Sequence, residues 1–78
     1  MKSWPERLIE RFSSSEKGHK FGVKVRGEPG VRIGVVEEYG KDYLRLVTAE
    51  HDLLIAYDAI AWVDNNERRA RAVVGKVL

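Results

Sequence analysis

The chain contains no cysteine, which excludes disulfide bonds and thiolate metal sites. No apolar run approaches the roughly 20 residues that a transmembrane helix needs, and the first residues lack the apolar core of a signal peptide. We therefore expect a cytoplasmic protein with no membrane partner. With 78 residues, one domain can bury only roughly 60–65% of its unfolded surface. Oligomerisation is the usual remaining support for so small a chain, and it also hides strand edges.

Residues with catalytic or metal-binding chemistry are also scarce. The two histidines, His19 and His51, are far apart in the sequence and both fall in predicted loops. Zinc needs three or four converging ligands, and no such spacing occurs. There is no nucleophile elbow, phosphate loop or dinucleotide-binding glycine pattern. We predict neither an enzyme nor a cofactor or metal site.

Alternating apolar residues dominate the middle of the chain. Alternation across 21–25 and 31–35 is typical of half-buried strands, and further short apolar segments follow at 43–47, 53–57 and 60–63. Strands this close together indicate a small sandwich or barrel. Gly34 lies inside the second strand, where a glycine permits the sharp bending that closes a few strands into a small barrel.

The two ends of the chain carry helical patterns. Ser3 and Glu6 have the spacing of a capping box, and Trp4, Leu8 and Phe12 form one apolar stripe, so we predict a helix over 3–14. Residues 1–20 would then be a helix and connector, 21–63 the barrel and 64–78 a tail. In the tail, apolar residues recur at helical spacing after a possible cap at Asn66. Valines and a glycine oppose helix formation there, so a short frayed helix and a partly disordered tail both stay open.

Charge and aromatic residues suggest where a ligand could bind. Residues 1–63 hold ten basic and ten acidic side chains, so the net charge of +2 lies entirely in the tail. Tyr39 and Tyr43 flank a predicted turn that contains Lys41, and Arg45 follows it. Aromatic rings that stack bases, together with cations that contact phosphates, are typical of proteins that bind single strands. The alternatives are that the tyrosines pack against the barrel and that the tail cations are a solvated surface.

Several segments together resemble the Sm-like family, which includes the bacterial Hfq-like proteins. Residues 23–27 and 31–36 are similar to the first Sm motif, and 43–46 stand at its end. Residues 55–63 look like the second motif, and 5–9 look like the family's N-terminal helix. The resemblance covers about residues 5–63, and generic SH3-like barrels share the same pattern. It implies a mainly β fold, a strongly bent five-stranded Sm- or SH3-like barrel with an N-terminal helix. The apolar spacing of the tail adds a possible short C-terminal helix.

The resemblance also implies an assembly and a ligand. Sm-like proteins form rings of six or seven subunits in which the fourth strand of one subunit pairs with the fifth strand of the next. Tyr43 matches the aromatic position that stacks on a base at the inner pore. Arg45 stands where Sm proteins often have an asparagine, Lys41 where they have an aspartate, and Asp58 where bacterial members place a basic residue or histidine.

We therefore predict a homo-oligomeric ring, a hexamer or heptamer, that binds single-stranded RNA. The alternative is a structural or protein-interaction module with the same barrel and no nucleotide site. The RNA-binding residues predicted for the ring are Tyr43, Arg45, Lys41, Tyr39, Arg68, Arg69 and Arg71. The predicted subunit-interface residues are Leu53, Ile55, Tyr57, Ile60 and Trp62.

Overall fold

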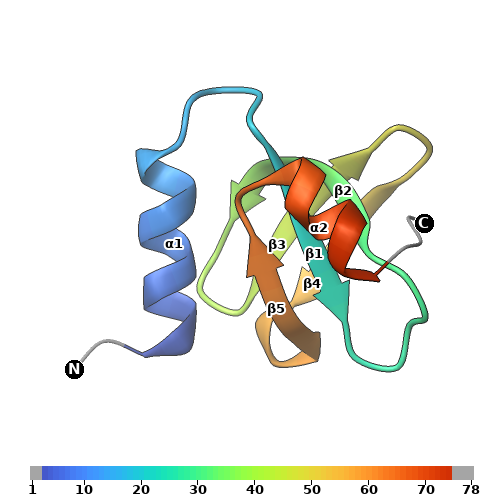
Figure 1. Cartoon of the computed structure of the whole chain (residues 1–78). Helices are drawn as coiled ribbons and strands as arrows, with labels where there is room; N and C mark the ends of the chain where they lie inside the picture. The colour runs from blue at the N-terminus through green and yellow to red at the C-terminus, as the bar shows by residue number, and fades with distance from the viewer. Residues whose placement is uncertain (1–2, 75–78) are drawn as a thin grey trace.

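The computed structural model describes residues 3–74, with side chains for residues 3–70. It is mainly β, with five strands and a helix at each end of the described part (Figure 1). The elements in order are α1 (Trp4–Ser14), β1 (Lys20–Val25), β2 (Arg32–Tyr39), β3 (Tyr43–Thr48), β4 (Asp52–Ala56), the 3₁₀ helix η1 (Tyr57–Ala59), β5 (Ile60–Asp64) and α2 (Glu67–Val74). The predicted strands and N-terminal helix are confirmed. In the tail, residues 67–74 form a helix, and residues 75–78 lie outside the described part.

The five strands form one antiparallel sheet in the order β4-β3-β2-β1-β5. In the described part of the chain β4 pairs only with β3 and β5 only with β1, so the sheet is not closed into the predicted barrel. The three residues of η1 carry the chain directly from one edge strand to the other. This short link brings the two edges together only at one end.

Gly34 is required for a different reason from the bend predicted for it. A Cβ atom at this position would overlap the backbone carbonyl of Val47 on β3. The register of β2 against β3 shifts between Val36 and Glu38, nearer the end of the strand. Gly34 therefore permits a close approach of two strand backbones, while the irregularity in the ladder lies farther along β2.

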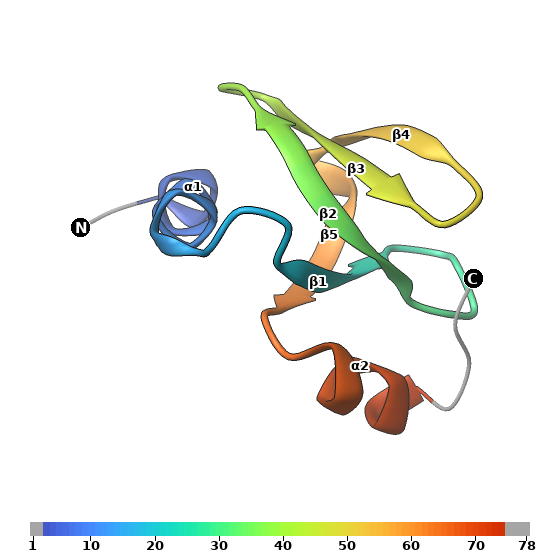
Figure 2. The same ribbon diagram turned by 90° about the horizontal axis from the view of Figure 1, so that it is seen from above.

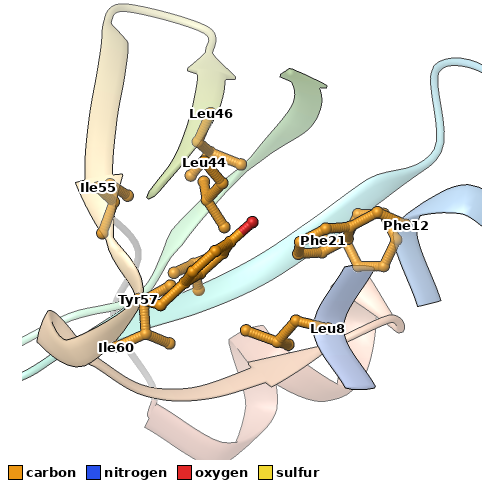
Figure 3. Close-up of a cluster of buried hydrophobic side chains, with 9 residues drawn as sticks. Leu8, Phe12, Phe21, Leu44, Leu46, Ile55, Tyr57 and Ile60 are labelled. Atoms are coloured by element: carbon orange, nitrogen blue, oxygen red, sulfur yellow. The ribbon is translucent and has the colours of Figure 1, made fainter. Parts of the chain in front are cut away.

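The inner face of the sheet holds the main hydrophobic core, which α1 covers. The helix begins at the predicted cap, where the Glu6 N–H donates to Ser3 Oγ at 3.3 Å. Leu8 and Phe12 of the predicted stripe are buried, whereas Trp4 at its start is 43% exposed. The Phe12 ring meets the Phe21 ring edge to face, with centroids 5.2 Å apart. The buried residues of this core are Leu8, Phe12, Phe21, Val23, Leu44, Leu46, Ile55, Tyr57 and Ile60 (Figure 3).

The second helix, α2, covers part of the opposite face. Phe21 and Val23 point into the main core, so Gly22 between them faces the other side of the sheet. There α2 inserts Ala70, which is fully buried, and a Cβ atom at Gly22 would overlap the Ala70 Cβ. Figure 2 shows α2 running beside β1 and β5. This second cluster consists of Val31, Ile33 and Ala70, with Trp62 packed against it.

Candidate nucleic-acid interface

The turn between β2 and β3 is held by hydrogen bonds from both sides. Across the turn, the Gly40 N–H donates to the Tyr43 carbonyl at 2.8 Å. From the end of β4, the Tyr57 N–H donates to the Asp42 carbonyl at 3.0 Å, and the Tyr57 hydroxyl donates to the Gly40 carbonyl at 2.8 Å. The segment that carries three of the predicted RNA-binding residues is therefore fixed to the body of the sheet.

The two tyrosines that flank this turn are exposed but lie on opposite faces. Tyr39 pairs with the buried Leu44, so its side chain is on the inner face, where its ring lies 5.8 Å from that of Phe12. Tyr43 precedes Leu44 and therefore points to the outer face, where it stands opposite Ala56 of β4. Their exposed fractions are 40% and 44%. The structure does not bring them together as one stacking platform. Of the two, Tyr39 has an aromatic neighbour and Tyr43 has none among the side chains of residues 3–70.

Arg45 is occupied by carboxylates. Its Nε and Nη2 atoms donate to the two carboxylate oxygens of Asp52 at 2.8 and 2.7 Å, and Nη1 donates to Glu38 at 3.2 Å. Hydrogen bonding to Asp52 raises the pKa of Arg45, and the same contact lowers the pKa of Asp52. The charge of Arg45, which was predicted to contact a phosphate or a base, is thus compensated by these two carboxylates.

Lys41 is the cation of the turn itself. It is exposed and makes no ion pair within the described residues. It lines a hollow of 350 Å³ together with Pro5, Asp42, Ala56, Tyr57 and Asp58. The hollow mixes one cation with two carboxylates, so its charge alone does not favour an anion.

The tail arginines lie far from the turn. The β2–β3 turn and α2 are on opposite sides of the molecule in Figure 2. Arg69 is engaged, because its Nε donates to Asp64 at 2.7 Å and its guanidinium spans both oxygens of that carboxylate. Arg68 is exposed, and the side chain of Arg71 lies outside the described part. Tail and turn therefore do not form one continuous basic surface.

Most of the predicted interface side chains are inside the subunit. Ile55, Tyr57 and Ile60 are 6, 3 and 1% exposed and belong to the main core. Leu53 packs against that core, and Trp62 packs against the second cluster. Three of the five predicted side chains are therefore used within the subunit, and Leu53 and Trp62 are partly buried.

Sequence reasoning missed Leu54, which is 70% exposed on the outer face of β4. It stands opposite Arg45 in the β3–β4 ladder. The signal was present in the alternation, since Leu53 and Ile55 cannot both point inward unless Leu54 points outward. A large apolar side chain on an edge strand is a feature that an interface explains.

Within the described residues, no three histidine, cysteine or acidic side chains are grouped to hold a metal ion, and neither helix has the length and apolar character needed to cross a membrane. No protein-family model, no curated protein and no solved structure matches the chain.

Proposed function

We propose that the chain assembles into a homo-oligomeric Sm-like ring, with a hexamer or heptamer as the expected size, that binds single-stranded RNA through Tyr43. The observation that carries the proposal is the topology of the sheet, whose two open edges are β4 and β5. These are the two strands that the resemblance pairs between neighbouring subunits. Because the two edges differ, pairing β4 of one subunit with β5 of the next is a heterologous contact, which forms a closed ring when the rotation between subunits fits.

The hydrogen bonds of the β3–β4 ladder show which groups β4 could offer. The Thr48 N–H donates to the His51 carbonyl, and the Tyr57 N–H donates to the Asp42 carbonyl, so these are hydrogen-bonded pairs. In an antiparallel ladder such pairs alternate with pairs whose N–H and C=O groups point away from the partner strand. The residues of β4 with outward backbone groups are therefore Asp52, Leu54 and Ala56.

In the proposed ring, RNA would bind at the start of β3, on the outer face of the sheet. Tyr43 offers an exposed ring on a turn that is fixed by hydrogen bonds, and Lys41 offers on the same turn a cation that makes no ion pair within the described residues. Base stacking on an aromatic ring tolerates different bases, so the site would favour unpaired strands over a particular sequence. Arg45 would contribute by holding Asp52 and Glu38, and a direct phosphate contact would require it to leave them.

The assembly is tested first, by light scattering of the purified protein. We expect a mass six or seven times that of one chain. Leu54→Pro removes an outward N–H without removing a bond to β3, and proline is tolerated on an edge strand of this kind, so the variant should lower the mass while the far-ultraviolet spectrum stays unchanged. Leu54→Ala, which keeps the N–H, is the matched control and should remain assembled. A wild-type monomer would remove the ring proposal.

RNA binding is tested with fluorescent oligo-U and oligo-A over a series of salt concentrations. Tyr43→Ala should weaken binding by roughly 1–3 kcal/mol, whereas Tyr43→Phe, which keeps the ring, should stay close to wild type. Affinity should also fall as salt rises, because phosphate contacts release counterions. Equal affinities of the alanine and phenylalanine variants would contradict stacking on Tyr43.

The second candidate function is a protein-interaction module that keeps the assembly without a nucleotide site. Two observations favour it, namely the exposed Leu54 and the compensation of Arg45 by two carboxylates. An assembled protein that binds neither oligo-U nor oligo-A at low salt would support this candidate and exclude the RNA proposal.

A further inference from the structure

We propose that the hydroxyl of Tyr57 is a positioning group that holds the β2–β3 turn and thereby fixes the ring of Tyr43 for stacking. The inference rests on the proposed function for its consequence in RNA binding. Its structural part, the fixing of the turn, can be measured without any ligand.

Tyr57 reaches the turn from a rigid place in the fold. It follows β4 directly, begins η1 and is only 3% exposed, with its ring among the side chains of the main core (Figure 3). Its backbone N–H and its hydroxyl grip the turn at two points, the carbonyls of Asp42 and Gly40. A ring packed into the core has few rotamers open to it, so the hydroxyl sits at a fixed place.

The Tyr43 ring lies against Gly40, the residue whose carbonyl accepts from the Tyr57 hydroxyl. The Gly40 N–H donates to the Tyr43 carbonyl at 2.8 Å, so the two backbones are joined. A Cβ atom at Gly40 would stand 3.4 Å from Cε1 of Tyr43, which places the Tyr43 ring beside the Gly40 backbone. Releasing the Gly40 carbonyl would therefore loosen both the backbone and the packing of the proposed stacking residue. An aromatic side chain that must be ordered on binding gains less affinity than one that is already in place.

The Tyr57 hydroxyl remains a donor over the physiological range. Burial is the main cause that raises the pKa of Tyr57, and the neighbouring Tyr39 and Asp42 raise it further. A phenol with a raised pKa keeps its proton, and the Gly40 carbonyl can only accept. The bond therefore does not depend on pH near neutrality.

The test compares wild type with Tyr57→Phe, which removes the hydroxyl and keeps the buried ring. Ile33→Val is the matched control, because it removes one buried methylene from the second cluster, remote from the turn. Amide hydrogen exchange is followed by NMR at Gly40, whose N–H is bonded to Tyr43. In Tyr57→Phe we expect exchange there to accelerate about fivefold, the effect of losing one hydrogen bond. Ile33→Val should leave it unchanged relative to the rest of the sheet.

Trypsin cleavage after Lys41 provides a second measurement of the same turn, and it should also be faster in Tyr57→Phe alone. Unchanged exchange and unchanged cleavage in Tyr57→Phe would overturn the inference. If Ile33→Val changed them equally, the effect would be general destabilisation, and the inference would also fail.

The consequence for RNA is measured with the same oligo-U. Tyr57→Phe should weaken binding about three- to tenfold, and the double variant with Tyr43→Ala should bind no more weakly than Tyr43→Ala alone, since the hydroxyl acts through Tyr43. Additive losses would contradict that route. A wild-type protein that binds no RNA would refute the proposed function, and the exchange and cleavage results would still decide whether Tyr57 fixes the turn.

Discussion

The two helices cover opposite faces of the same sheet in different ways. α1 inserts two large side chains, Leu8 and Phe12, into a core of nine buried residues. Among the side chains of α2 that the structure describes, residues 67–70, the small Ala70 enters a space that exists because residue 22 of β1 is glycine. The first helix is held by the quantity of apolar surface it buries, whereas the described contact of the second depends on the fit of one methyl group. The variants that follow separate these two modes of attachment.

The largest effect is expected from Phe12→Ala. The phenyl ring is 7% exposed and contacts Phe21 and Tyr39, so its removal leaves a cavity between α1 and the sheet. We expect the free energy of unfolding to fall by about 3–5 kcal/mol. A chain of 78 residues has only roughly 4–12 kcal/mol in total, so the loss should be plain in urea unfolding followed by circular dichroism.

Trp4→Ala is the matched control on the same helix. Its ring is larger than that of Phe12 but 43% exposed, so we expect the loss to be about 1 kcal/mol. Similar losses in the two variants would mean that α1 is not held chiefly through its buried stripe.

An intermediate effect is expected from Gly22→Ala. The new Cβ would overlap the Ala70 Cβ and press on Val31, so α2 must shift or leave the sheet. We expect a loss of about 1–3 kcal/mol, which cannot exceed the docking free energy of α2 because the helix can detach. Trp62 packs in this cluster, so its fluorescence in a Trp4→Phe background should shift to longer wavelength. Trypsin cleavage after Arg68 should accelerate at the same time.

The double variant Gly22→Ala with Ala70→Gly tests the fit itself. It moves the methyl group from the helix to the strand and removes the overlap. Trp62 fluorescence should return toward wild type, although glycine in the helix costs about 1 kcal/mol. A double variant that stays as perturbed as Gly22→Ala would show that the overlap at Ala70 is not the cause.

This contrast also explains which parts of the fold could be predicted from the sequence. The stripe, cap and limits of α1 are local signals, as are the alternating residues of the strands and the short link at Tyr57–Ala59. The contact that docks α2 on the sheet is not a local signal, because it joins Gly22 to Ala70, which lies 48 positions later in the sequence. Closure of the sheet is not local either, since alternation determines which face a residue occupies and says nothing of how far the two edges lie apart.

The candidate site divides in the same way. The exposure of Tyr43 follows from its place at the start of a strand beside a polar turn. The pairing of Arg45 with Asp52 depends on the register of β3 against β4, which the sequence does not state. On β4 the interface prediction chose Leu53 and Ile55, which are the alternate side chains that face the core. It therefore included the buried Ile55 and omitted the exposed Leu54.

The smallest effects are expected at the two helix caps, where the chemistry is nearly the same and the attachment differs. Ser3 Oγ accepts from the Glu6 N–H at 3.3 Å, and Asn66 Oδ1 accepts from the Arg69 N–H at 2.9 Å. Replacing either cap by alanine should cost about 1 kcal/mol. In Ser3→Ala the cost should appear in the free energy of global unfolding, because α1 leaves the sheet only when the main core is lost.

In Asn66→Ala the same cost should appear locally, because α2 can detach while the sheet stays folded. We expect faster trypsin cleavage after Arg68 with little change in the urea midpoint, since local opening exposes a site without global unfolding. The ion pair between Asp64 and Arg69 remains in this variant and limits the effect. If Asn66→Ala lowered the urea midpoint as much as Ser3→Ala, α2 would unfold together with the sheet. The two helices would then differ in the size of their contacts but not in the cooperativity of their attachment.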